Sequence, residues 1–327
     1  GRSPRLEVAI GAIFLSFLLA YLTYKFVEQP IRSKIKNKKQ LLTIGILSCV
    51  ILVFSSAIIL FKGFDWRISE NKNFLIRTTS RGDISDQKCL DIYHDIGNKY
   101  CHISGLNQNK KIFIIGDSQA QAIFNGYEQK LVEENYQVIH LAIPGCPFFL
   151  DEKNSSGKLT KDEQTVADCN VMFRKVIDAA IKQKPQAILF SNNGWNDKSK
   201  EFANSMKETF NLIPNSIPII YFTQVPKMPF DPINCVRKED NLKNHCAFSR
   251  ASYDESAANY SLILNDLKKS YSNLRIINSI DAICDKTQCF ASDDFGIFYS
   301  DKTHLSKYGA LMFARKMPIA YTKLQFY

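Results

Sequence analysis

The sequence of 327 residues has little of what a metal site, a repeat architecture or a nucleic-acid surface needs. It contains five histidines and no Cys-x-x-Cys pair, so it lacks the usual ligand spacing of a structural zinc site. It has no internal repeat and no low-complexity stretch. The formal net charge is +10, but nine of the 42 Lys and Arg residues and only two of the 32 Asp and Glu residues lie in residues 1–62. The rest of the chain is nearly neutral, so we predict no nucleic-acid partner. Because the ligand spacing is missing, we also predict no metal site.

Two long apolar runs stand near the start of the chain, at residues 6–26 and 41–61. Each has about the 20 residues that are needed to cross roughly 30 Å of hydrocarbon. We expect two transmembrane helices, with buried helices of a soluble domain as the alternative. The basic segment 28–39 between them should stay in the cytoplasm, because positively charged loops do so. Everything after about Lys62 then lies outside the cytoplasm.

The rest of the chain suggests an α/β fold. Residues 63–109 contain no long apolar run, and we expect a partly structured linker or extension there. From residue 110 to 327 strand and helix patterns alternate, which predicts a parallel sheet covered by helices on both faces. The expected strands are 112–115, 137–143, 187–191, 217–223 and 274–280, and the expected helices are 119–134, 163–182, 198–212, 251–270 and 305–317.

Ser118 follows the first of these strands, in the motif Gly116-Asp117-Ser118. At a strand-to-helix turn its hydroxyl would lie at the carboxyl edge of the sheet, where an α/β fold places a nucleophile. A helix N-cap is the alternative role for this serine.

Asp301 and His304 form the second half of the pattern, near the other end of the chain. Side chains three residues apart on one turn can project to the same side. His304 could then accept the proton of Ser118 while Asp301 fixes the tautomer of the imidazole. The alternative is an aspartate that caps the last helix, with a solvated histidine beside it.

The pairing of these two motifs resembles the first and last blocks of the SGNH/GDSL hydrolase superfamily. The resemblance implies a flavodoxin-like three-layer fold and an oxyanion hole that includes a glycine and an asparagine. Gly145, after the second strand, is the expected glycine, and its N–H would act together with that of Ser118. Gly194-Trp195-Asn196-Asp197 resembles the third block, which makes Asn196 the expected side-chain donor and Asn193 its rival.

Residues 17–32 resemble the end of the acyltransferase-3 family of membrane proteins, through Glu28, Pro30, Ile31 and Arg32. Only the last helix of that family is present and no methionine precedes Met172, so we expect a fragment of a longer protein. Members with a fused SGNH domain are bacterial O-acetyltransferases of surface carbohydrates. The resemblance therefore implies a protein of the inner membrane with a periplasmic C-terminal domain. Its membrane acyltransferase domain would be the partner, and acetyl-CoA would be the donor to that domain rather than a cofactor of these residues.

The expected function is transfer of an acyl group, such as acetyl, to a carbohydrate such as the lipopolysaccharide O-antigen. Ser118, His304 and Asp301 would carry the reaction through an acyl-enzyme. Two alternatives stay open: a carbohydrate esterase with the same triad, and an inert domain that only positions glycan.

Eight of the nine cysteines follow the second apolar run, and they fall into close successive pairs. An even count in a domain outside the cytoplasm favours disulfides over free thiols. Neighbour pairing is the simplest connectivity, but the sequence alone leaves others open. The expected bonds are Cys89–Cys101, Cys146–Cys169, Cys235–Cys246 and Cys284–Cys289.

Two features could border an acceptor cleft. The long loop at residues 225–250 contains three prolines and a cysteine pair, and could form the rim of the cleft or pack on the domain. Trp195, Phe298 and Tyr299 could stack on a sugar ring or belong to the core.

Overall fold

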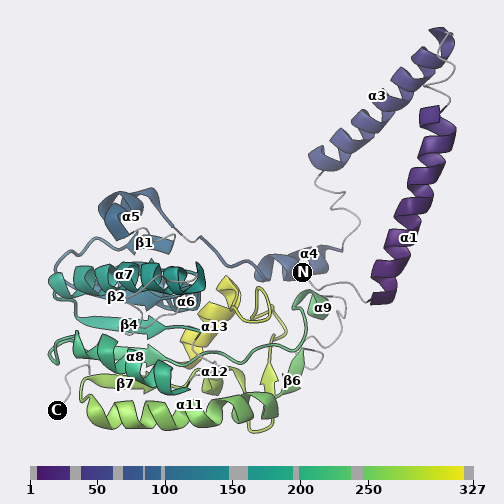
Figure 1. Cartoon of the computed structure of the whole chain (residues 1–327). Helices are drawn as coiled ribbons and strands as arrows, with labels where there is room; N and C mark the ends of the chain where they lie inside the picture. The colour runs from purple at the N-terminus through teal and green to yellow at the C-terminus, as the bar shows by residue number, and fades with distance from the viewer. Residues whose placement is uncertain are drawn as a thin grey trace. The chain divides into compact units, whose positions relative to one another are not determined.

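The computed structural model describes residues 6–29, 38–61, 69–83, 85–96, 100–146, 161–193, 199–236 and 246–319 (Figure 1). The chain divides into two compact units, Gly1–Ile68 and Ser69–Tyr327.

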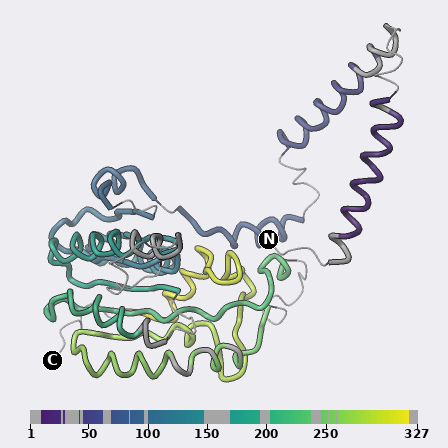
Figure 2. The backbone as a smooth tube through the Cα atoms, in the orientation of Figure 1, coloured from purple at the N-terminus to yellow at the C-terminus, as the bar shows by residue number. Residues whose placement is uncertain are grey.

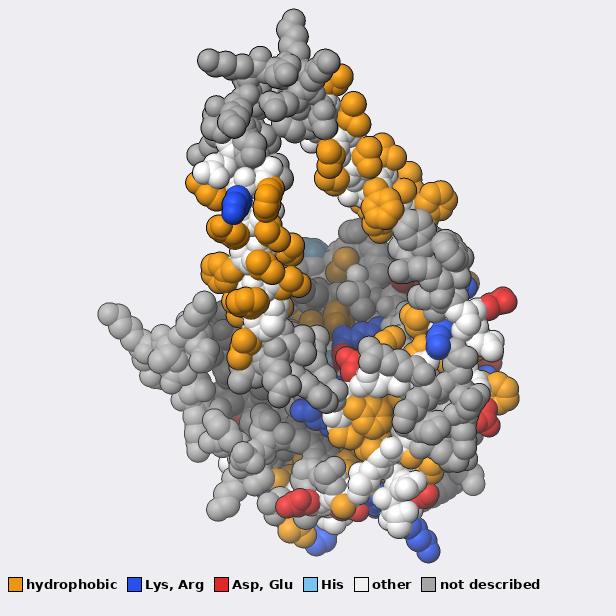
Figure 3. Space-filling model, turned by 90° about the vertical axis from the view of Figure 1, so that its right-hand side faces the viewer, with side chains coloured by type: hydrophobic (Ala, Val, Ile, Leu, Met, Phe, Trp, Pro, Cys, Tyr) orange, Lys and Arg blue, Asp and Glu red, His pale blue; other side chains and the backbone are white. Residues whose placement is uncertain are grey.

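The first unit is helical. It contains α1 (Leu6–Thr23), the single π-helical turn η1 (Tyr24–Glu28) and α3 (Lys38–Leu60). Apolar side chains gather along both long helices (Figure 3), and large ones such as Phe17 and Ile59 are mostly exposed. Within the described part of the chain, no helix combines the length and the apolar character that crossing a membrane requires. The structure thus supports helices near the two apolar runs but not the prediction that they are membrane spans.

The second unit is built on a six-stranded sheet in the order β1-β3-β2-β4-β5-β7. Five strands are parallel, as the alternating pattern predicts, while β1 runs antiparallel to β3 at one edge. Figure 2 traces the backbone as a tube coloured by residue number, in which the described residues from 69 to 104 are blue. The sequence did not predict that residues 100–104 join the sheet. The strands are β1 (Tyr100–Ser104), β2 (Lys111–Gly116), β3 (Gln137–Ala142), β4 (Ala187–Ser191), β5 (Ile219–Phe222) and β7 (Leu274–Ile277).

Helices cover both faces of the sheet, which gives the predicted three layers (Figure 1). Alternate residues of β2 point to opposite faces. Ile112 and Ile114 belong to one apolar core, with α6 (Ala120–Glu133) and α13 (Lys307–Lys316). Phe113 and Ile115 belong to the other core, with α7 (Lys161–Lys182), α8 (Ser199–Asn211) and α11 (Ala251–Ser270). Burial on both faces explains why β2 is almost continuously apolar.

Shorter elements complete this unit. Before the sheet lie α4 (Glu70–Thr78), α5 (Gln87–Ile92) and η3 (His94–Ile96). The later elements are α9 (Ile233–Val236), α12 (Ile280–Ile283) and the two-stranded sheet of β6 (Ala247–Ser249) and β8 (Gln288–Phe290). The predicted strand 274–280 was too long, because β7 ends at Ile277 and α12 begins at Ile280. Between them, Ser279 donates its N–H to the hydroxyl of Thr223 at 2.8 Å.

Four disulfides join the same neighbouring cysteines that the sequence pairs. Cys89–Cys101 ties α5 to β1, and Cys146–Cys169 ties the loop after β3 to α7. Cys49 is free and exposed. The first bond links α5 to the edge strand of the sheet. The second bond restrains the loop that carries Gly145.

Candidate active site

Three neighbouring strand ends create the site. In the sheet, Gly116 of β2 pairs with Ala142 of β3 on one side and with Ser191 of β4 on the other. All three strands are parallel, so the segments that follow them emerge at the same edge. Those segments carry Ser118, Gly145 and Asn193, and the topology therefore brings the predicted nucleophile between the two predicted oxyanion segments.

Gly116 shapes the turn that presents Ser118. A Cβ at this position would lie 1.9 Å from the carbonyl oxygen of Ser191, so only glycine allows β2 to approach β4 this closely. Helix α6 begins at Ala120, two residues after the serine. This local geometry holds the partly exposed hydroxyl of Ser118 at the sheet edge, beside the N-terminus of the helix.

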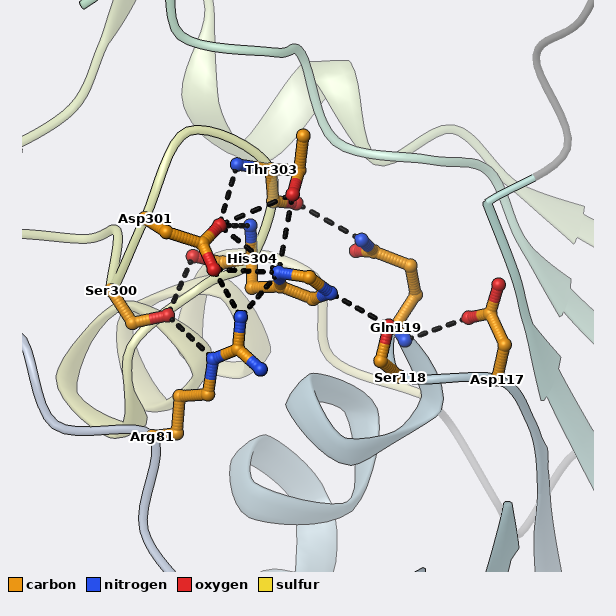
Figure 4. A network of polar contacts seen from close by, with 8 residues as sticks. All are labelled: Arg81, Asp117, Ser118, Gln119, Ser300, Asp301, Thr303 and His304. Carbon is orange, nitrogen blue, oxygen red and sulfur yellow. Dashed lines mark hydrogen bonds and ion pairs between the residues drawn. The ribbon is translucent and has the colours of Figure 1, made fainter. Parts of the chain in front are cut away.

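The structure brings Ser118, His304 and Asp301 together (Figure 4). The Oγ of Ser118 lies 2.6 Å from Nε2 of His304. On the other side of the ring, Nδ1 lies 2.9 Å from Oδ2 of Asp301. Ser118 and His304 are 186 positions apart in the sequence. Together with Asp301 they meet in the order serine, imidazole, carboxylate. A hydroxyl, a base and a group that orients the base are the parts of an activated nucleophile.

Asp301 organises its own loop as well as the imidazole. Its Oδ1 accepts the backbone N–H groups of Thr303 and His304, at 2.8 and 2.9 Å. Partial burial raises the pKa of Asp301, but the hydrogen bonds from the His304 ring and from these N–H groups lower it more, and the result lies well below the ordinary value. The carboxylate therefore stays ionised at any pH at which the imidazole can act as a base. Asp301 does not cap the last helix, since Ser306 does so by accepting the N–H of Gly309 at 3.0 Å.

Long-range contacts fix the loop of residues 300–304, which we name the base loop. The side-chain amide of Gln119 donates to the carbonyl of Thr303 at 3.0 Å, so the start of α6 holds the base loop directly. Met228 donates its N–H to the carbonyl of Lys302 at 2.8 Å. Next to the base loop, the buried Tyr299 donates its hydroxyl to the carbonyl of Pro226 at 2.8 Å.

These contacts also decide part of the question about the cleft. Phe298 and Tyr299 are buried core residues and offer no face to a sugar. Val225 and Met228 are buried too, so the start of the loop at 225–250 packs against the domain. Residues 237–245 and Trp195 lie outside the described residues. The rim of an acceptor cleft stays a prediction.

Asp117 belongs to the Gly-Asp-Ser motif, but the sequence predicts no role for it. Its buried side chain accepts two backbone N–H groups at 2.8 Å, that of Gln119 on Oδ1 and that of Asn193 on Oδ2. Burial raises the pKa of Asp117 to about 6, against the lowering effect of these hydrogen bonds. Asp117 therefore joins the nucleophile turn to the segment after β4.

The predicted oxyanion residues are only partly described. Gly145 is exposed in a turn with φ of +77°, which favours glycine, and the turn is closed by the Cys146 N–H donating to Ile143. Asn193 is exposed and uses its backbone N–H on Asp117, while Asn196 lies outside the described residues. The structure places Gly145 and Asn193 on the two segments that flank Ser118, and their roles stay predictions.

Arg81 is a charged side chain of the site that the sequence pattern missed. It comes from the segment before the sheet and donates from Nη2 to Oδ2 of Asp301, and from Nε to Oγ of Ser300 at 3.1 Å (Figure 4). The same Nη2 lies 2.5 Å from Nδ1 of His304. An arginine 220 residues from its partner carries no sequence signal that could have found it.

Comparison with known proteins agrees with this architecture. The model of a family described as "SGNH domain (fused to AT3 domains)" matches residues 86–318. Among solved structures, the periplasmic domain of a lipopolysaccharide acetyltransferase from Salmonella ser. Paratyphi A has the same fold, with a TM-score of 0.54 and 20% sequence identity. That match covers 76% of this chain and 96% of the other. None of the curated proteins matches the chain. Because the family match spans most of its length, the chain belongs to the family of SGNH domains that are fused to AT3 domains.

Proposed function

We propose that this chain carries the catalytic domain of an O-acyltransferase that acetylates bacterial surface carbohydrate through an acyl-enzyme on Ser118. The observation that carries the proposal is the 2.6 Å approach of the Ser118 hydroxyl to His304, whose other ring nitrogen faces Asp301. The family and the likeness to an acetyltransferase periplasmic domain support this assignment of substrate and compartment. The catalytic domain would lie in the periplasm, held at the inner membrane by the AT3 domain to which such domains are fused.

The first half-reaction is acylation of the serine. Nε2 of His304 accepts the hydroxyl proton while Oγ of Ser118 forms a bond to the acyl carbonyl carbon. The N–H groups of Ser118 and Gly145 and the side chain of Asn196 would stabilise the oxyanion. The imidazolium then returns its proton to the departing group of the donor, and the acyl group stays on the serine. The donor is the acyl group delivered by the AT3 domain, and acetyl-CoA is the proposed source on the far side of the membrane.

The second half-reaction moves the acyl group to the acceptor. A sugar hydroxyl gives its proton to Nε2 of His304 and attacks the acyl carbon, and Oγ of Ser118 leaves and takes that proton back. Asp301 stays ionised and stabilises the imidazolium in both halves. The chemistry needs no redox step.

Hydrolysis is the second candidate function, and the exposure of the site favours it as a side reaction. The side chain of Asp301 is 44% exposed and that of His304 is 20% exposed, so water reaches the triad. Transfer and hydrolysis differ only in which hydroxyl attacks the acyl-enzyme. An acceptor that fills the cleft would suppress the water reaction.

The test is glycan acetylation in cells that carry the full-length protein. With the intact protein we expect O-acetyl groups on the surface carbohydrate, and with Ser118→Ala we expect none at equal protein abundance. Unchanged acetylation with Ser118→Ala would contradict the proposal and would favour a domain that only positions glycan. Loss of acetyl groups from pre-acetylated glycan, without transfer, would favour the esterase.

A further inference from the structure

Hydrogen bonds from α6 and α13 hold the loop that carries Arg81 in place. The side-chain amide of Asn125 in α6 donates to the carbonyl of Arg81 at 2.6 Å. The N–H of Lys307, at the start of α13, donates to the carbonyl of Ser80 at 2.7 Å. These are backbone acceptors, so the loop keeps its anchors when the side chain at position 81 is changed.

The guanidinium of Arg81 donates hydrogen bonds to two successive residues of the base loop. Nε donates to Oγ of Ser300, and Nη2 donates to Oδ2 of Asp301. The other carboxylate oxygen is already occupied by the N–H groups of the base loop. Only a planar group with several fixed donors makes both contacts together. The orientation of Asp301 thus depends on a residue outside the base loop.

The same guanidinium lies beside the ring of His304. Nη2 lies 2.5 Å from Nδ1 of the ring, and a guanidinium can only donate hydrogen bonds. Both Nη2 and Nδ1 contact the same carboxylate oxygen, Oδ2 of Asp301. Arg81 therefore acts on His304 through the position of this shared oxygen.

We propose that Arg81 is a positioning residue for the reaction: it aims the carboxylate of Asp301 at Nδ1 of the His304 imidazole. The proposal rests on the proposed serine chemistry. It gives the segment before the sheet a task in the reaction, because a residue that precedes the first parallel strand sets the position of the carboxylate that orients the base.

The experiment measures kcat and KM for hydrolysis of p-nitrophenyl acetate by the full chain, for the unchanged protein, Arg81→Met, Arg81→Lys, Asp301→Asn, the double variant of Arg81→Met with Asp301→Asn, and Ser118→Ala. Arg77→Met is the matched control, since Arg77 is an exposed arginine of the same segment. A residue that acts by aiming Asp301 loses its effect once that carboxylate is removed, whereas a residue with only a structural role keeps its effect.

We expect Arg81→Met to lower kcat about tenfold with little change in KM, because the carboxylate is less well aimed. In the Asp301→Asn background the same change should have no further effect on kcat. Arg81→Lys keeps the charge but not the planar arrangement of donors, so its kcat should also fall. Arg77→Met should change neither kcat nor KM.

An unchanged kcat in Arg81→Met would overturn the proposal, and so would an equal further loss of kcat in the Asp301→Asn background. A variant faster than the unchanged protein would also overturn it, since Arg81 would then block the site. If Ser118→Ala hydrolyses the ester as fast as the unchanged protein, the proposed serine chemistry fails instead. The two failures are therefore distinguishable in one set of rates.

Discussion

The nucleophile side and the base side of the site are built in opposite ways. Ser118 is positioned by one continuous stretch, from β2 through the turn to α6, with Gly116 packed against the neighbouring strand. The base loop is instead held by Arg81, Gln119 and Met228, which belong to three separate parts of the chain. A strand–turn–helix unit is specified by its own residues, whereas the base loop depends on the finished fold. The nucleophile side should therefore respond to local strain and the base side to distant substitutions.

The largest expected effect tests whether the two sides work as one unit. Ser118→Ala and His304→Ala should each lower kcat/KM by about 10⁴-fold or more, and the double variant should lose little beyond either single change. Ester hydrolysis under single-turnover conditions measures this, with Ser270→Ala on the exposed face of α11 as control. Additive losses would mean that the two residues act independently.

Asp301→Asn should produce the next largest effect. The neutral amide can offer its N–H to Nδ1, which leaves the imidazole in the tautomer that cannot accept the serine proton. We expect a fall of about 10³- to 10⁴-fold in kcat/KM at neutral pH, measured with the same ester. Asp266→Asn, on the exposed side of α11, should leave the rate unchanged. A loss below tenfold would show that the carboxylate is not needed to orient the base.

A pair of glycines separates local strain on the nucleophile side from backbone preference alone. In Gly116→Ala the new Cβ would meet the carbonyl of Ser191, and we expect the free energy of unfolding to fall by about 3 kcal/mol or more. In Gly145→Ala no atom lies within 4 Å of the new Cβ, so only the positive φ matters, and the loss should be about 1 kcal/mol. Denaturant unfolding of both variants gives the comparison. Equal losses would mean that β2 can move away from β4.

The smallest effect is a dependence of stability on pH that comes from Asp117. Its pKa is raised to about 6 from an ordinary 3.8, so the folded protein holds this proton more tightly than the unfolded chain. The group then favours folding at low pH, and this contribution, up to about 3 kcal/mol, is lost as the pH rises from about 4 to about 6. The difference in unfolding free energy between the unchanged protein and Asp117→Asn should fall across that window and level off above it. A flat difference would mean that Asp117 is not buried in solution.

The sequence predicts the features that depend on local patterns, and it misses those that depend on contacts between distant residues. The parallel strands, the helices on both faces and the turn at Ser118 all rest on local patterns of apolar residues and turn residues. Strand β1 was missed because its residues are mixed in polarity and most are only partly buried, and because its pairing with β3 is known only from the fold. Arg81 and the double acceptor role of Asp117 were missed for the same reason, since each depends on one contact across at least 76 residues.

The second compact unit begins earlier in the chain than the predicted SGNH-like domain. Residues 63–109 were predicted to be a linker or extension before a catalytic domain at 110–327. In the structure, residues 69–109 belong to the same compact unit as the sheet, and they supply both its edge strand and Arg81. A linker and an integral layer have similar composition, so only the packing separates them.

The most direct test of the account is to trap the acyl-enzyme. The full chain is mixed with an activated acetyl ester, quenched with acid, digested and mapped by mass spectrometry. We expect one acetyl group on the peptide that contains Ser118, absent in Ser118→Ala and discharged when the carbohydrate acceptor is added before the quench. Turnover without acetyl on that peptide, or acetyl on another residue that discharges to the acceptor, would contradict it.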